Sequence, residues 1–137
     1  MIIDGTNLIL GRLATTAAKK SLQGEEVVIV NCANVVVTGD KKKNLAKYKQ
    51  KSERGARDTG PYIPRQSDKF VKRTIRGMLP YKKPRGRDAF KSIRCYVGVP
   101  ENLKGEPETL KNADISKVTQ TKHITVKELC KSLGGKI

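Results

Sequence analysis

Residues 26–31 read Glu-Val-Val-Ile-Val-Asn, and the four positions from Val27 to Val30 are all β-branched. An unbroken β-branched run is typical of a strand that is covered on both faces, as in a parallel sheet flanked by helices. The sequence upstream fits this arrangement, because apolar residues recur there at helical spacing and Gly24 supplies a helix stop. We therefore predict an α/β unit over the first 40 residues, with strands at 1–3, 26–31 and 35–37.

A basic helix and a basic loop are predicted next. Thr38-Gly39-Asp40 offers a turn and an N-cap, and residues 41–49 contain five lysines. Residues 50–66 lack periodicity but contain two glycines, two prolines and three arginines, which predicts a long loop. A loop of this length in a compact domain is usually functional or disordered, and both descriptions suit a segment that becomes ordered on a binding partner.

The clearest helix in the sequence covers residues 67–79. Its apolar residues fall on one side and its basic residues on the other, namely Phe70, Val71, Ile75, Met78 and Leu79 against Lys69, Lys72, Arg73 and Arg76. Pro80 ends this helix, and residues 81–87 (YKKPRGR) are predicted to form a second, stiffer basic loop. This helix is expected to build the core with one face and to meet phosphate with the other.

The rest of the chain carries weaker signals. Residues 92–99 alternate like a strand. Thr125 and Glu128 form a capping box that opens a helix through Leu133, and Gly134 ends it. Residues 100–122 are polar and weakly patterned, so no element is predicted there.

Almost all of the net charge lies in one part of the chain. The segment from Lys41 to Arg94 holds 19 of the 29 Lys and Arg residues and four acidic residues, a net charge of +15 out of +16. Concentrated like charge destabilises a compact fold by self-repulsion, and a polyanion relieves it. Several of these arginines stand beside Gly or Pro, where small or rigid neighbours let backbone and guanidinium approach a phosphate closely. Nucleic acid is therefore the first partner expected for residues 41–94.

Catalytic, metal and cofactor sites find no support in the sequence. His123 is the single histidine and has no Cys or carboxylate at a recognisable spacing, so we expect a structural role for it. There is no CxxC, no HExxH and no paired Cys/His cluster, so no metal site is expected. Aromatic residues make up 4% of the chain and Trp is absent, which disfavours base-stacking platforms.

Composition also limits the location of the protein. No apolar run approaches the roughly 20 residues of a membrane span, and the first residues lack the pattern of a signal peptide. The three cysteines lie far apart in the sequence and fit buried thiols in a reducing compartment. We expect a cytoplasmic protein whose 137 residues form one domain with a basic, RNA-facing region at 41–94.

Several strings resemble one family in their order and spacing. LGRLAT at 10–15, VVVTGDK at 35–41, and RGMLP at 76–80 followed by GR at 86–87 resemble the large-subunit ribosomal proteins of the L-thirteen family. The resemblance covers about residues 1–100, and RGMLP in this position is its specific signal. The ending lacks the His-, Pro- and Gln-rich tail of bacterial members and the long C-terminal helix of eukaryotic ones, so the chain resembles the archaeal type.

The resemblance implies a three-layer α/β/α fold with a four-stranded, mostly parallel sheet. It also implies a structural role in the large ribosomal subunit and in its early assembly, with contacts to large-subunit rRNA and to neighbouring ribosomal proteins. No cofactor, small-molecule substrate or membrane partner is implied. The residues expected to contact RNA are basic side chains of the predicted helices and loops: Lys41, Lys42, Lys43, Lys47, Lys49, Lys51, Arg54, Arg57, Arg65, Lys69, Lys72, Arg73, Arg76, Lys82, Lys83, Arg85 and Arg87.

Two alternatives stay open at this point. The charge alone also fits an architectural DNA-binding protein or an mRNA-regulatory protein, and co-sedimentation with large subunits in high-salt washes would separate these from a ribosomal protein. A nucleotide-using α/β enzyme is the second alternative, because a helix opens near Gly11 after a strand. Gly11 stands there without a GxGxxG pattern, so we expect no enzyme, and stoichiometric nucleotide binding would contradict this expectation.

Overall fold

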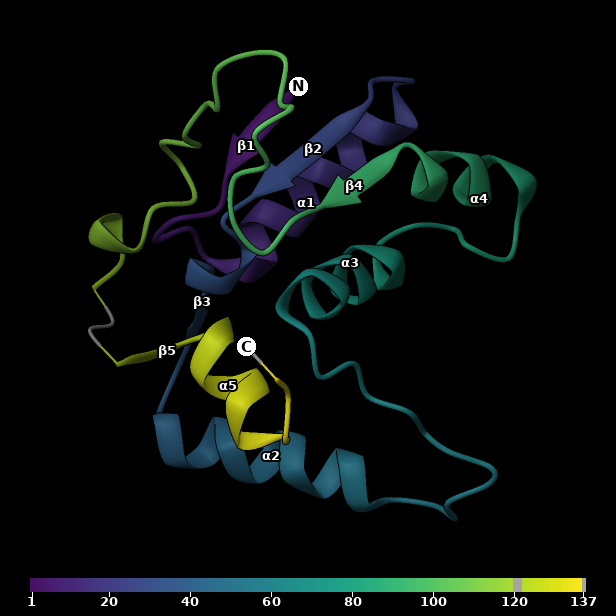
Figure 1. Cartoon of the computed structure of the whole chain (residues 1–137), viewed down its shortest axis with the longest axis vertical. Coiled ribbons are helices and arrows are strands. Elements are labelled where there is room, and N and C mark those ends of the chain that lie inside the picture. Colours follow the sequence, from purple (N-terminus) through teal and green to yellow (C-terminus); the bar gives the residue numbers. More distant parts are fainter. Residues whose placement is uncertain (120–121, 137) are drawn as a thin grey trace.

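A three-stranded parallel sheet forms the centre of the molecule (Figure 1). The computed structural model describes residues 1–119 and 122–136. The sheet has the order β1-β2-β4, from β1 (Ile2–Asp4), β2 (Val27–Val30) and β4 (Ile93–Cys95). Val27, Ile29 and Val30 of β2 are buried, as the apolar run predicts. The α/β class is confirmed.

The outer edge of β1 is covered by the C-terminal third of the chain instead of a fourth strand. The backbone N–H of Asp4 donates to the carbonyl of Glu108 at 3.0 Å, and that of Glu108 donates to the carbonyl of Ile2 at 2.9 Å. This isolated bridge lies in the segment 100–122 for which the sequence predicted no element. A short 3-10 turn, η2 (Ile115–Lys117), follows within the same segment, and residues 120–121 lie outside the described part of the chain.

The remaining two strands form a separate antiparallel sheet. β3 (Val36–Thr38) pairs with β5 (His123–Thr125), so the expected four-stranded sheet is corrected to three strands plus two. The reason lies just after β2. Asn31 adopts the left-handed conformation, with φ of 55°, and starts the 3-10 turn η1 (Cys32–Asn34), which turns the chain away from the main sheet.

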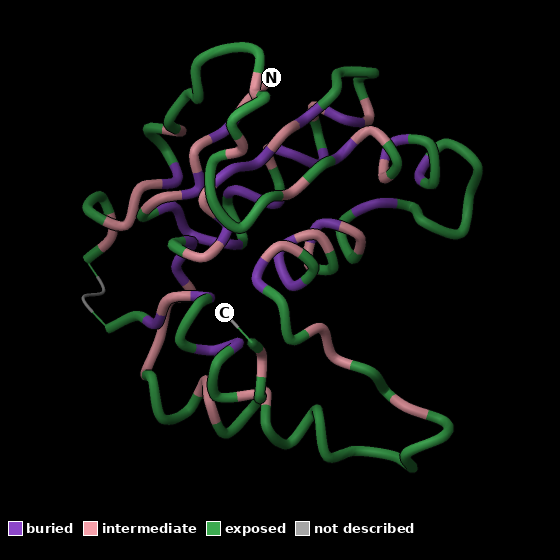
Figure 2. The backbone as a smooth tube through the Cα atoms, viewed as in Figure 1, coloured by how far each residue is buried: buried purple, intermediate pink, exposed green. Residues whose placement is uncertain are grey.

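Three helices contact the main sheet, and the first of them packs against the other two. They are α1 (Leu10–Leu22), α3 (Ser67–Gly77) and α4 (Pro84–Lys91). α1 turns Leu13, Ala14 and Ala17 inward with no exposed surface, and these small alanines allow the neighbouring helices to approach closely. Figure 2 shows the buried residues concentrated in the sheet and in the inner sides of these helices.

α4 replaces the predicted second basic loop. Pro84 occupies the first turn of the helix, where proline is favoured because its fixed φ suits a helix and its missing N–H would have no partner. The prediction of a loop over 81–87 was therefore wrong from Pro84 onward. α3 ends at Gly77, two residues earlier than predicted, so Met78 lies beyond the helix and is 43% exposed, whereas Leu79 turns into the core.

Two further helices lie away from the main sheet. α2 (Lys41–Glu53) continues four residues beyond the predicted basic helix, and α5 (Val126–Ser132) lies beside it at the end of the molecule remote from the three-stranded sheet (Figure 1). Thr125 caps α5 as predicted, because its hydroxyl accepts from the N–H of Glu128 at 3.3 Å. β4 is shorter than the predicted strand at 92–99, and Val97 and Val99 are exposed. Within the described residues, no helix is long and apolar enough to span a bilayer.

Candidate nucleic-acid interface

The predicted RNA-contacting residues lie on four successive pieces of structure. α2, the segment 54–66, α3, and α4 with the preceding Lys82 and Lys83 follow one another along one side of the molecule (Figure 1). Fifteen of the seventeen predicted cations are exposed, and the two that are half-buried are Lys72 and Arg76 of α3. The structure therefore arranges these cations as a long strip, which we call the basic edge, and not as one compact patch.

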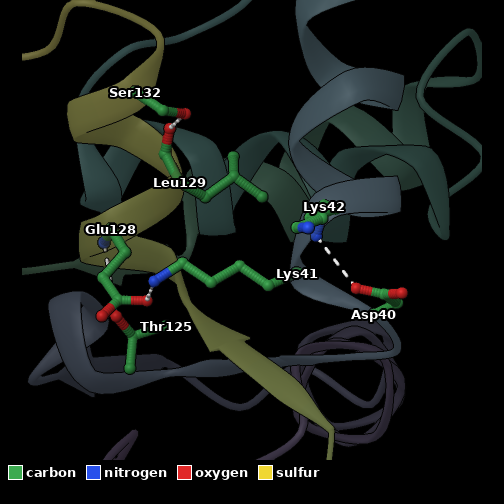
Figure 3. Close-up of polar contacts among 7 residues, drawn as sticks. All are labelled: Asp40, Lys41, Lys42, Thr125, Glu128, Leu129 and Ser132. Carbon is green, nitrogen blue, oxygen red and sulfur yellow. Dashed lines mark hydrogen bonds and ion pairs between the residues drawn. The ribbon is translucent and has the colours of Figure 1, made fainter.

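α2 is fixed at its first turn by contacts with two neighbouring residues (Figure 3). The N–H of Lys42 donates to Oδ1 of Asp40 at 3.0 Å, so Asp40 is the N-cap that the sequence predicts. The ammonium of Lys41 lies 3.2 Å from Oε2 of Glu128 on α5. Among the seventeen predicted cations, Lys41 is the one that forms an ion pair within the described part of the chain. The other cations of α2 keep their charge available to a partner.

One aromatic contact joins α2 to the core. The ring of Tyr48 packs edge-on against that of Phe70 of α3, with centroids 5.3 Å apart, and burial raises the pKa of Tyr48. The ammonium of Lys51 lies 5.4 Å from the centroid of the same tyrosine. α2 has no fully buried residue, and half-buried Leu45 and Tyr48 are the residues that pack it against the hydrophobic core. Its lysines are left on the solvent side.

The segment 54–66 has internal structure of its own. The N–H of Gly60 donates to the carbonyl of Ala56 at 3.0 Å, and the hydroxyl of Tyr62 donates to the carbonyl of Arg57 at 2.9 Å. Arg73 of α3 donates to the carbonyl of Tyr62 at 3.0 Å, so one predicted RNA contact also anchors this segment. Tyr62 itself is 65% exposed at the middle of the segment. The low aromatic content disfavours stacking platforms, and no sequence pattern points to this ring.

The corner between α3 and α4 holds its cations against aromatic rings. The ammonium of Lys72 lies 4.9 Å from the ring centroid of Phe90, and the guanidinium of Arg76 lies 5.1 Å from that of Tyr81. The two rings pack edge to face with centroids 5.4 Å apart. These contacts explain why Lys72 and Arg76 are half-buried, and they limit the rotamer freedom of both cations. On α4, Arg87 donates to the carbonyl of Lys82 at 3.1 Å.

Gly86 does not have the role that the sequence suggested. A Cβ at this position would lie 2.1 Å from the carbonyl oxygen of Pro80, and Gly86 is buried. This glycine therefore lets α4 pack on the turn after α3, and its backbone is not available to a phosphate. Gly77 differs, because a Cβ there would meet nothing within 4 Å.

A small cavity involves two residues that are not among the predicted RNA contacts. Arg94 in β4 and Tyr96 just after it line a cavity of about 350 Å³ together with Lys69 and Lys72 of α3. Asp68 and Cys95 complete its wall. Arg94 lies within the basic segment 41–94, but the sequence offered no signal that it meets the lysines of α3. The structure therefore adds one more exposed cation next to the basic edge.

Comparison with known proteins gives one consistent result. The family model for ribosomal protein L13 matches residues 1–102 of this chain. The chain is 46% identical to large ribosomal subunit protein uL13 of Archaeoglobus fulgidus, over 97% of this chain and 86% of that protein. It is 46% identical to the uL13 protein of Methanosarcina barkeri and 47% identical to that of Methanocaldococcus jannaschii, in both cases over 98% of each chain. The resemblance to the archaeal type is thereby confirmed.

Proposed function

Because the chain belongs to the ribosomal protein L13 family, and is thus a protein of the large ribosomal subunit and not an enzyme, we propose that its basic edge binds the RNA of that subunit. We further propose that it does so early in subunit assembly, beside neighbouring ribosomal proteins. The observation that carries the proposal is the exposure of fifteen of the seventeen cations along four successive elements. When exposed cations meet phosphates, counterions condensed on the RNA are released, and this release supplies much of the affinity.

The shape of the basic edge suggests how it would act in assembly. Four elements in succession can reach phosphates on more than one RNA segment, whereas a compact patch can reach one. Three kinds of contact fix these elements before binding: the N-cap of α2, the ring contacts of Lys72 and Arg76, and the bond from Arg73 to the segment 54–66. Less conformational entropy is then lost on docking. A protein of this kind stabilises an RNA junction as soon as its segments come together.

The test compares two variants with the same loss of charge. Lys43, Lys47, Arg57 and Arg85 lie on the basic edge, are exposed and form no side-chain hydrogen bond, ion pair or ring contact in the described structure, so their change to Gln should leave the fold intact. The matched control changes Lys19, Lys111, Lys117 and Lys127, which are exposed outside 41–94, to Gln. Binding to purified large-subunit rRNA is measured across a salt titration, and incorporation into large subunits is followed in cells.

The measured quantity is the slope of the logarithm of the binding constant against the logarithm of the salt concentration. We expect the magnitude of this slope to fall by about 3 in the edge variant, because each phosphate contact contributes roughly 0.7 to 0.9. The control variant should keep a slope close to that of the wild type and should enter large subunits normally. Equal effects in the two variants would show that overall charge, and not the basic edge, drives binding. Equal affinity and slope on duplex DNA of the same length would favour the architectural alternative.

A further inference from the structure

The three cysteines of this chain, which are far apart in the sequence, come together at the start of α3. Cys32 lies in η1, Cys95 in β4 and Cys130 in α5, and each of these elements packs against α3. All three thiols are free, and Asp68 of the first turn of α3 acts electrostatically on both Cys32 and Cys130. Within the described residues, no group of His, Cys, Asp or Glu has the geometry to hold a metal ion. Thiol chemistry is therefore the chemistry to consider for these three cysteines.

Two of these thiols are neighbours because of the strand register. Ile29 of β2 lies opposite Cys95 of β4, and the N–H of Tyr96 donates to the carbonyl of Ile29 at 2.8 Å. The N–H of Cys32 then donates to the carbonyl of Tyr96 at 3.0 Å, so the backbone on both sides of the pair is tied together. The hydrogen bond with the Cys95 side chain, followed by burial, raises the pKa of the Cys32 thiol far above its ordinary value. The Cys32 thiol also donates to the carbonyl of Ile29 at 3.8 Å, and Ile29 is the register partner of Cys95. Cys32 and Cys95 are thus neighbouring thiols.

The two thiols differ in their access to solvent. Cys32 has no exposed surface, whereas Cys95 is half-buried and lies in the wall of the 350 Å³ cavity at the end of β4. Three cations line that cavity, Lys69, Lys72 and Arg94, against one acidic residue, Asp68. A small reagent therefore meets Cys95 first, and the excess of positive charge attracts an anionic reagent.

We propose that Cys95 is a thiolation site for small anionic disulfides and that Cys32 is its resolving cysteine. The Cys95 thiolate attacks one sulfur of the reagent, forms a mixed disulfide and releases one thiolate of the reagent. Cys32, on losing its proton, attacks the Cys95 sulfur and releases the second thiolate. The chain loses two protons and two electrons and gains the Cys32–Cys95 disulfide, while one molecule of reagent disulfide is reduced to two thiols. Burial of Cys32 assigns this order, because a buried thiol is a poor first nucleophile.

The experiment uses the folded, fully reduced chain and oxidised glutathione as the probe. The remaining thiols are blocked with N-ethylmaleimide, and the intact mass and proteolytic peptides are read by mass spectrometry. We expect loss of two of the three free thiols, a Cys32–Cys95 peptide pair, a free Cys130 and full reversal by a reductant. Retention of all three thiols, or a disulfide that contains Cys130, would overturn the proposal without any variant.

Three single variants assign the roles. Cys32→Ser should stop at a stable glutathione adduct on Cys95, Cys95→Ser should form neither adduct nor disulfide, and Cys130→Ser should react like the wild type. A wild-type chain that accumulates the same stable adduct as Cys32→Ser would contradict the resolving role. Each variant is checked by circular dichroism, and the wild-type result stands by itself if a variant fails to fold.

The charge of the reagent is tested with a cationic disulfide, cystamine. Each rate of thiol loss is divided by the rate on the urea-unfolded chain, which removes the intrinsic reactivity of the reagent. At low salt we expect the corrected rate to be several-fold higher for oxidised glutathione than for cystamine, and the difference to shrink as salt rises. Equal corrected rates at low salt would refute the preference for an anionic reagent.

Discussion

Replacing Gly86 by alanine is expected to destabilise the fold without touching a charged residue. The new Cβ would lie 2.1 Å from the carbonyl oxygen of Pro80 and 2.9 Å from the backbone nitrogen of Tyr81, whereas ordinary contacts begin near 3.4 Å. Backbone atoms cannot rotate away as a side chain does, so α4 must move by more than 1 Å relative to the turn after α3. Overpacking of this kind costs about 3 kcal/mol at the upper end of its range.

A gain from helix propensity offsets part of this cost. Alanine is favoured over glycine inside a helix by about 1 kcal/mol, which leaves a net loss of about 2 kcal/mol. With a urea m-value of about 2 kcal/mol per molar, the unfolding midpoint should fall by about 1 M. The assay is urea unfolding followed by circular dichroism, with the slope of the transition compared as well as its midpoint.

Gly77→Ala is the matched control, because Gly77 is also a helical glycine next to an arginine of the basic edge. A Cβ there meets nothing within 4 Å, so the midpoint should stay unchanged or rise. If Gly86→Ala kept the wild-type midpoint, or if both variants lost the same stability, close packing of α4 on Pro80 would not be the reason for a glycine at position 86.

Three further perturbations test contacts of β1 and of α2. Asp4→Asn should lower the free energy of unfolding by about 1 kcal/mol at pH 7. Burial raises the pKa of the Asp4 carboxyl, but hydrogen bonds from Asn31 and Thr6 outweigh burial and lower this pKa below 3.8. The stabilisation by Asp4 is therefore present above pH 3.8 and is lost as the pH falls through the pKa of the folded state. The urea midpoints of variant and wild type should thus converge on acidification, and a difference that stays constant with pH would contradict this. Asp40→Ala should cost about 1 kcal/mol through loss of the α2 cap, measured by urea unfolding, and an unchanged midpoint would show that the cap is dispensable. Tyr48→Ala should speed amide hydrogen exchange in residues 41–53 but not in α1, and uniform exchange changes would refute a local role for the ring contact.

The elements that follow from local signals were predictable. The β-branched run gives β2, the Asp40 and Thr125 caps give the starts of α2 and α5, and the two-sided pattern gives α3. α4 was not found, because proline and glycine within three residues indicate a loop unless proline stands at a helix start and glycine meets a close neighbour. Between the strands of the two sheets stands one left-handed residue, Asn31, whose backbone conformation the β-branched pattern does not show.

The candidate site was predictable as a set of cations but not as an arrangement. The concentration of charge selects residues 41–94, and most of the side chains predicted there to contact RNA are exposed in the structure. The cavity shared by α3 and β4, and the neighbouring positions of Cys32 and Cys95, depend on strand register and helix packing between distant parts of the chain. Spacing along the sequence contains no direct signal for such contacts.

The closing of the β1 edge by Glu108 has a consequence for folding during synthesis. β1 and β3 leave the translating ribosome early, but their partners at residue 108 and in β5 are among the last parts to be made. Contacts so distant in sequence form slowly, and unpaired strand edges invite aggregation until they are covered. The nascent chain thus carries its whole cationic segment while both sheets are unfinished, and mutual repulsion between such chains helps to keep them apart. We expect the fold to close in one late step, once nearly all of the polypeptide has been released.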